Sequence, residues 1–156
     1  MPAQGRLMVL RREQGTEFAE CATRTGTLRA WVLARDVYAT QGEGHMQDEH
    51  FEFIKAYGEE RIRRAGGKVY VFHDWTEMTG YDSSSRVKLT SWSIAHRDCF
   101  QEAHLAVRSR VIVLGVQVAN IAVGGFMRAH SGTASLEIEL DRVLRRGSSL
   151  APSPPK

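Results

Sequence analysis

The sequence predicts an α/β domain with a mixed sheet of four or five strands and helices packed mainly on one face. Short apolar runs alternate along the chain with longer segments in which apolar residues recur every three or four positions. Glycine pairs at 66–67 and 124–125 follow two of these periodic segments, as is common where helices end. The length of 156 residues is that of one ordinary domain.

The first part of the chain predicts a meander of strands. Leu7–Leu10 and Thr16–Cys21 are strand candidates on either side of Gln14-Gly15, and a third apolar run extends from Leu28 to Val37. The glycines at 42 and 44 lie in a polar stretch that we interpret as a connection. This stretch lacks the third glycine of a dinucleotide-binding motif.

A helix is predicted from Asp48 to Ala65. Acidic residues lie at its start and arginines at its end, as the helix dipole favours, and its apolar stripe consists of Phe51, Ile54, Gly58 and Ile62. The run Val69–Phe72 follows and reads as a buried strand.

The second half predicts further helices and short strands. A helix that starts near Asp82 places on one side Leu89, Trp92, His96 and Cys99. Strand candidates are His104–Val107 and Phe126–His130. A last amphipathic helix, which Ser131 or Thr133 could cap, carries Leu136, Leu140, Val143 and Leu144.

The segment Ser109–Val123 has apolar steps of a helix but almost no polar face. We therefore expect its outer face to contact neighbouring helices or a second copy of the chain, so a homodimer is one interpretation. A long strand is the alternative interpretation of this segment, because Val and Ile are abundant there. Residues 1–146 are expected to form one domain. Residues 147–156 are rich in serine and proline and are expected to form a disordered tail.

The junction between the fourth apolar run and the next helix carries the most informative motif. The run ends in Asp74, and a turn that contains Gly80 is expected to lead to Asp82 and three serines, Ser83, Ser84 and Ser85. Asp82 is predicted to cap the helix by accepting hydrogen bonds from backbone N–H groups two and three residues on. The serines then lie in the first turn, where the helix dipole favours negative charge. A capped helix start without further function is the simpler interpretation.

The spacing of Asp74 and Asp82 resembles the signature of STAS domains, which include the bacterial anti-sigma-factor antagonists of the SpoIIAA-like group. In that family an aspartate at the end of a central strand precedes an Asp-Ser-Ser-Gly or Asp-Ser-Thr-Gly motif by eight residues. Trp75, Thr76, Met78 and Tyr81 match the residue types between the two aspartates, and Leu89 matches a buried leucine of the helix. The resemblance implies a STAS-like fold over about residues 16 to 145.

The resemblance also implies a non-enzymatic protein-interaction module in cytoplasmic signalling. Its partner would be a kinase that acts as an anti-sigma factor, or another regulator. Ser83 matches the serine that such a kinase phosphorylates, and Ser84 is its neighbour. Phosphate adds about −1.5 to −2 charges, which a docked partner would have to desolvate.

This chain departs from the signature at three positions. Ser85 stands where the family has glycine, and Arg86 and Lys88 replace small or apolar residues. Together with Asp82, these residues are the predicted contacts to a partner protein, and the two cations suit an acidic partner or a bound phosphate. The SpoIIAA-like group is also similar to the lipid-carrying Sec14-like domains, which implies a lipid or small anion as an alternative ligand. Trp75, Met78 and Trp92 are the candidates to line such a pocket.

Other function classes receive little support from the sequence. No serine elbow and no phosphate-binding loop are present, so we expect no enzyme activity and no cofactor, although a histidine beside Ser83 (His73 or His96) stays open. His45, Asp48, Glu49 and His50 lack the spacing of a zinc helix, and we expect no metal. Acidic residues number 18 against 21 basic ones, which argues against nucleic-acid binding. No apolar run approaches the ~20 residues of a membrane span, and two separated cysteines suit the cytoplasm.

Overall fold

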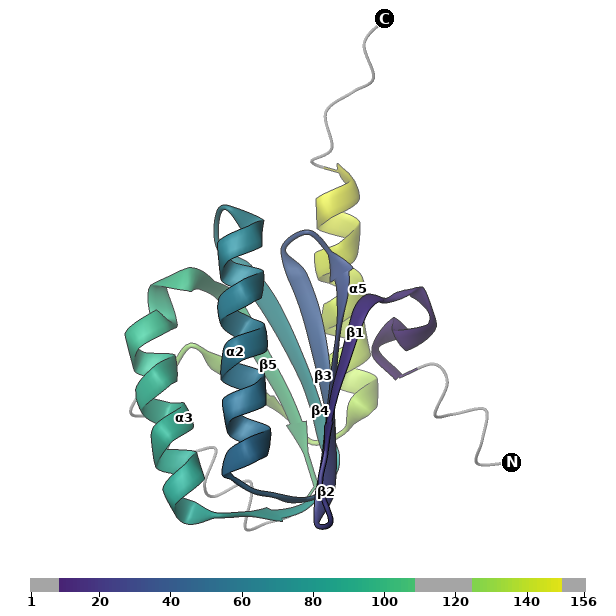
Figure 1. The fold of residues 1–156 in the computed structure, drawn as a ribbon. Coiled ribbons are helices and arrows are strands. Elements are labelled where there is room, and N and C mark those ends of the chain that lie inside the picture. Colours follow the sequence, from purple (N-terminus) through teal and green to yellow (C-terminus); the bar gives the residue numbers. More distant parts are fainter. Residues whose placement is uncertain (1–8, 109–124, 150–156) are drawn as a thin grey trace, which may run out of the picture.

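The computed structural model describes residues 9–108 and 125–149 of the chain (Figure 1). Within these residues one six-stranded sheet runs in the order of the sequence. The first three strands pair antiparallel and the remaining pairs are parallel. The strands are β1 (Thr16–Ala22), β2 (Gly26–Ala34), β3 (Val37–Met46), β4 (Val69–Tyr81), β5 (Phe100–Val107) and β6 (Met127–His130). The sheet is thus mixed, as predicted, but has more than the predicted four or five strands.

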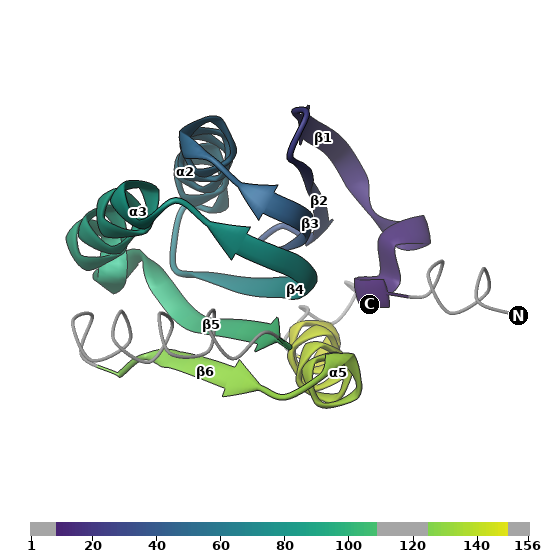
Figure 2. The ribbon, with the colours of Figure 1, turned by 90° about the horizontal axis from the view of Figure 1, so that it is seen from below.

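Helices cover both faces of this sheet (Figure 2). The helices α2 (Asp48–Ala65) and α3 (Ser83–His96) pack on one face, and α5 (Thr133–Ser149) packs on the other. Short 3-10 turns, η1 (Val9–Gln14) and η2 (Arg97–Cys99), precede β1 and β5. The core on the α5 side joins Trp31, Phe72, Leu136 and Leu140, all almost fully buried. The core under α2 and α3 contains Phe51, Trp75, Met78 and Leu105.

The N-terminal meander is present, but its strands differ from those predicted. Residues 9 and 10 of the predicted strand Leu7–Leu10 belong to the 3-10 turn η1, so this prediction is wrong there. The run Leu28–Val37 divides between β2 and β3. The polar stretch with Gly42 and Gly44 is part of β3, not a connection. Pairing with strands on both sides determines the strand conformation of this segment, since its own β-propensity is low.

The two glycines of β3 have separate structural reasons. A Cβ at Gly42 would lie 3.2 Å from the methyl carbon of Met78 and 3.3 Å from the ring of Trp75. Gly44 has φ of +83° and would place a Cβ 2.5 Å from the carbonyl oxygen of Thr25. Glycine therefore lets β3 bend where it meets β2 and the core beneath α2.

The helix α2 has the predicted bounds, and a buried histidine fixes its start. The Nδ1 atom of His50 accepts a hydrogen bond from the backbone N–H of Gln47 at 2.8 Å. Its Nε2 atom donates to the carbonyl of Gly26 at 3.0 Å. His50 thereby ties the first turn of α2 to the β1–β2 hairpin, while Gly66 ends the helix in the left-handed conformation.

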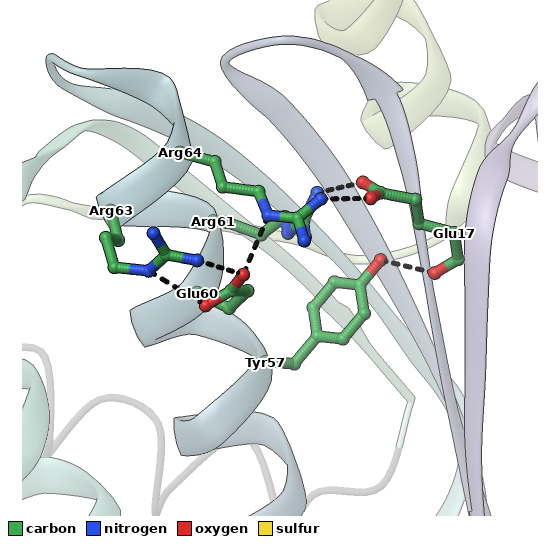
Figure 3. Close-up of polar contacts among 6 residues, drawn as sticks. All are labelled: Glu17, Tyr57, Glu60, Arg61, Arg63 and Arg64. Atoms are coloured by element: carbon green, nitrogen blue, oxygen red, sulfur yellow. Dashed lines mark hydrogen bonds and ion pairs between the residues drawn. The ribbon is translucent and has the colours of Figure 1, made fainter.

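At the outer edge of the sheet, β1 is attached to the end of α2 (Figure 3). Glu17 has φ of +53° at an irregular step in the pairing of β1 with β2. Its carbonyl accepts a hydrogen bond from the Tyr57 hydroxyl at 2.9 Å, and its carboxylate pairs with Arg61 and Arg64. These contacts hold a backbone conformation that costs about 1 kcal/mol or more for a residue with a side chain. The kink also interrupts an edge strand that could otherwise pair with another chain.

The later elements largely follow the predictions. β5 contains the predicted run His104–Val107. β6 contains the predicted run Phe126–His130 except for its first residue, Phe126. The last helix, α5, ends at Ser149, so its final three residues overlap the predicted tail 147–156. The candidate helix Ser109–Val123 and residues 150–156 lie outside the described residues.

Candidate functional site

The junction between β4 and α3 lies where the sequence placed it, but its geometry differs. β4 continues past Asp74 as far as Tyr81, so the predicted turn with Gly80 is wrong. Parallel pairing with β3 extends the strand, and Met46 lies opposite Tyr81. The backbone N–H of Asp82 then donates to the Met46 carbonyl at 3.0 Å, and α3 begins at the next residue.

Asp82 does not cap α3 with its side chain, contrary to the prediction. Its Oδ1 atom lies 2.8 Å from Nε2 of His45, which comes from the end of β3. The carboxylate is therefore engaged with the neighbouring strand. The first N–H groups of α3 have no intrahelical partner and no side-chain acceptor from Asp82.

The three serines occupy different environments. Ser83 and Ser84 are exposed, whereas Ser85 is fully buried. The hydroxyl of Ser85 donates to Oδ1 of Asp48, and Nζ of Lys88 lies 2.7 Å from Oδ2 of the same carboxylate. Hydrogen bonds from Lys88 and Ser85 lower the pKa of Asp48. Ser85 thus joins α3 to α2 beneath the surface, a position that does not suit the predicted partner contact.

Beneath α3 lies an apolar pocket with a volume of about 90 Å³. Trp75, Met78 and Trp92, the three residues suggested by the sequence, all line it. β4, β5, α2 and α3 supply its walls, and further lining residues include Phe51, Leu89, Leu105 and Phe126. The strands β4 and β5 present alternate residues to this face, because side chains alternate along a strand.

The hydroxyl groups that α3 contributes to the pocket wall form hydrogen bonds within that helix. Thr90 donates to the carbonyl of Arg86 at 2.9 Å, and Ser93 donates to the carbonyl of Leu89 at 2.9 Å. The indole N–H of Trp92 donates to Glu59 at 2.8 Å. These groups present mainly carbon to the pocket.

His73 is the histidine on the sheet side of the pocket. Trp75 donates to the Thr40 hydroxyl at 3.1 Å, and that hydroxyl lies 2.6 Å from Nδ1 of His73. Burial, with a smaller contribution from His104, lowers the pKa of His73 to about 3. The ring is therefore neutral at neutral pH and adds no charge to the pocket.

Arg86 supplies a positive charge to the pocket wall. It is half-buried and lines the cavity together with Tyr81 and Leu89. No carboxylate forms an ion pair with its guanidinium among residues 9–108 and 125–149, in contrast to Lys88 on the same helix. The sequence suggested Arg86 as a contact to a partner and did not show that it borders a pocket. In the sequence, Arg86 is two residues from Lys88 and three from Leu89. This spacing does not decide which face of the helix carries Arg86.

The histidines considered for catalysis or metal binding have separate partners. His96 contacts the carbonyl of Trp92 and His73 contacts Thr40, so within the described part neither histidine contacts the hydroxyl of Ser83. His45, Asp48 and His50 likewise bind different groups.

A cluster that the sequence analysis missed lies on the opposite face of the sheet. Glu102, His104 and Glu139 have potential metal-ligand atoms within 4.8 Å of one another. However, Arg142 lies 2.7 Å from Glu139 and also contacts Glu102. Arg128 also lies 3.3 Å from Glu102, so two guanidinium groups balance the two carboxylates, and the cluster does not fit a metal ion. The Glu-x-His alternation on one strand was the available signal.

Comparison with known structures identifies the architecture. The chain is similar to the crystal structure of an uncharacterised protein of the DUF3478 family from Shewanella loihica PV-4, which has a SpoIIAA-like fold. The match has a TM-score of 0.53 and 14% sequence identity, and it covers 79% of this chain and 91% of the other. This chain has a SpoIIAA-like fold. At this identity the likeness concerns the fold alone.

Sequence comparisons add no further relative. No protein-family model matches the chain, and no curated protein matches it. Among the described helices, none combines the length and apolar character that crossing a membrane requires.

Proposed function

We propose that the pocket beneath α3 binds a small amphiphile with an anionic head group, which is the ligand-binding alternative raised by the sequence. The observation that carries this proposal is the position of Arg86, which has no ion-pair partner among residues 9–108 and 125–149, at a pocket lined mainly by apolar residues. The SpoIIAA-like fold is compatible with this role but does not imply it.

The chemistry of the wall determines the two parts of the ligand. The wall offers the apolar surface of Phe51, Trp75, Met78 and Leu105. This surface favours an alkyl chain, because each Å² of apolar surface removed from water stabilises the complex by about 25 cal/mol. Arg86 favours a carboxylate or phosphate, since a charge-assisted hydrogen bond to arginine is stronger than a neutral one.

The volume limits the apolar part. The cavity of about 90 Å³ is smaller than an engineered cavity of roughly 150 Å³ that holds benzene, and far below the ~300–1,000 Å³ of drug-sized sites. This space suits the last few carbons of an alkyl chain better than a whole long acyl chain or a ring system. The head group would remain near the surface beside Arg86.

Octanoate is a suitable probe, and its binding can be followed by tryptophan fluorescence because Trp75 and Trp92 line the pocket. We expect saturable quenching or enhancement in the wild-type protein. Arg86→Gln should weaken binding about 10-fold, since the loss of one charge-assisted hydrogen bond at a half-buried position costs about 1.4 kcal/mol.

Lys88→Gln is the matched control for this titration. It removes a cation from the same helix, but Lys88 pairs with Asp48 and is not among the residues that line the pocket. Its affinity for octanoate should equal that of the wild type. Absence of saturable binding, or equal affinity in Arg86→Gln, would contradict the proposal.

The exposed serines favour a second candidate function, the phosphorylation-controlled protein interaction suggested by the resemblance. Ser83 and Ser84 are accessible at the start of α3, where a phosphate would meet free backbone N–H groups. Two exposed apolar residues, Val87 and Ile94, lie on the outer face of the same helix. Phosphopeptide mass spectrometry of the protein from its native cell tests this function, and Ser83 or Ser84 should carry the modification.

Acidic substitutions separate the serine that can accept a negative charge from the one that cannot. Ser85→Asp should destabilise the protein by about 3 kcal/mol or more, because it buries a carboxylate beside Asp48. Ser83→Asp should change the free energy of unfolding by less than about 0.5 kcal/mol, because Ser83 is exposed. Urea unfolding at pH 7 measures both, and equal losses would show that a charge at Ser83 disrupts the fold.

A further inference from the structure

A hydrogen-bonded chain of four side chains lies on the α5 face of the sheet, away from the pocket. Nε2 of His104 lies 2.8 Å from Glu102, and Nδ1 of His104 lies 3.0 Å from Nε2 of His130. Nδ1 of His130 in turn contacts the hydroxyl of Ser135. We refer to Glu102, His104, His130 and Ser135 as the polar chain.

The charge of Glu102 determines the direction of every hydrogen bond in the polar chain. Burial raises the pKa of Glu102, but hydrogen bonds from His104 and Arg142 and the charges of Arg142 and Arg128 outweigh this effect, so the pKa is lowered. The ionised carboxylate can only accept a hydrogen bond, so Nε2 of His104 carries a proton.

The remaining protons follow from this assignment. Neutral His104 then has an unprotonated Nδ1, which must accept the hydrogen bond from Nε2–H of His130. Nδ1 of neutral His130 is consequently unprotonated and accepts the Ser135 hydroxyl proton. The basic nitrogen of His130 is thus directed at a hydroxyl group, with a second histidine and a carboxylate behind it.

The position of each residue suits a reactive hydroxyl. His104 is fully buried and stacks on Phe72 with ring centroids 4.7 Å apart, which fixes the ring that orients His130. Ser135 is exposed and is the third residue of α5. The N–H groups of this first turn have no intrahelical partner and lie where negative charge is favoured.

From this geometry we propose that Ser135 is a nucleophile, activated by His130 as general base, that accepts an acyl group from small activated esters. Ser135 and His130 touch the reacting atoms, whereas His104 and Glu102 are positioning residues. This arrangement follows the logic of a serine–histidine–carboxylate triad with a second histidine inserted.

The reaction needs only the ester as co-reactant. Oγ of Ser135 forms a bond to the carbonyl carbon while its proton moves to Nδ1 of His130. The bond between the carbonyl carbon and the leaving oxygen then breaks, and the proton passes from His130 to that oxygen. The products are acyl-Ser135 and an alcohol or phenol.

Acetylation by p-nitrophenyl acetate, followed by peptide mass spectrometry, tests this proposal on the full chain. Ser84 is an internal control, because it is also exposed in the first turn of a helix but has no histidine contact among the residues described. We expect Ser135 to be acetylated about 100-fold faster than Ser84, the lower end of the usual effect of a general base. Similar rates at the two serines would overturn the proposal.

The variant His130→Asn separates base catalysis from simple accessibility. Asparagine retains an acceptor near the position of Nδ1 but cannot take up a proton at neutral pH. Acetylation of Ser135 should fall to the rate of Ser84, while circular dichroism checks that the fold persists. If the variant is unfolded, the pH profile of the wild type decides in its place.

The pH profile of the wild type should follow the protonation of His130. Burial, with a smaller contribution from His104, lowers the pKa of His130. The charged groups that face the polar chain are Glu102 on β5, Arg128 on β6, and Glu139 and Arg142 on α5. The rate of Ser135 acetylation should be constant above about pH 6.5 and decline below it. A rate that rises in proportion to hydroxide throughout, as for an unassisted hydroxyl, would contradict the proposal.

Discussion

Acidification from pH 6.5 to pH 3 is expected to remove up to about 5 kcal/mol of folding stability through His73 alone. The pKa of His73 is about 3 in the folded protein, whereas an unperturbed histidine has a pKa of about 6.5. Burial beside Trp75, with a smaller contribution from His104, favours the neutral ring.

The sign of this effect follows from proton binding. Between pH 6.5 and 3 the unfolded chain binds a proton at His73 that the folded protein does not bind, so stability rises with pH over this range. The contribution is complete above pH 6.5 and is lost progressively as the pH falls toward 3. Urea unfolding at several values between pH 4 and pH 8 measures the slope.

The variant His73→Asn isolates this residue from the other groups whose pKa values are lowered, such as Asp48 and Glu102. Asparagine supplies an oxygen near the position of Nδ1, so the Thr40 hydrogen bond can persist. The cost of the substitution at pH 8 sets the baseline. The difference between wild type and variant should shrink as the pH falls, and parallel stability curves would show that His73 titrates normally.

Glu17→Gln is expected to reduce the free energy of unfolding by about 2 kcal/mol. Glu17 pairs with Arg61, which is 7% exposed and whose Nε has no hydrogen-bond partner within the described part of the chain. Replacing the carboxylate by an amide leaves the buried guanidinium without its anionic partner, beside the ring of Tyr57. Breaking a fully buried pair costs ~3–5 kcal/mol, and the partial exposure of the Glu17 side chain reduces this value.

Glu60→Gln is the matched control in the same cluster (Figure 3). Glu60 pairs with Arg63 and Arg64, whose side chains are more than half exposed. Its loss should cost less than about 1 kcal/mol, because exposed ion pairs contribute little. Chemical unfolding at neutral pH compares the two variants, and equal losses would mean that burial of Arg61 does not determine the effect.

The helices of this fold could be predicted better than the strands. Apolar periodicity, charges at both ends and a terminal glycine identified α2 with its bounds, and the start of α3 and the existence of α5 were also predicted. β3 was missed because Gln41-Gly42-Glu43-Gly44 has the composition of a loop. Its strand conformation depends on β2 and β4, which lie far away in sequence.

The site was predicted in composition more than in geometry. The family resemblance suggested Trp75, Met78 and Trp92 as pocket residues, and the structure confirms that they line one. The environments of Ser85 and Arg86 depend on how α3 is rotated against α2. Because α3 carries apolar residues on both sides, its sequence does not determine that rotation. The polar chain joins residues from three elements, and local spacing signals only the Glu-x-His alternation of Glu102 and His104 within it.

The central claim, that an anionic amphiphile occupies the pocket beneath α3, is tested most directly by intermolecular NOEs between octanoate and the protein in solution. We expect NOEs from the terminal methyl group of octanoate to Phe51, Trp75 or Met78, and we expect its carboxylate to lie near Arg86. Bound octanoate with NOEs only to surface residues outside the pocket, or with the orientation reversed, would contradict it.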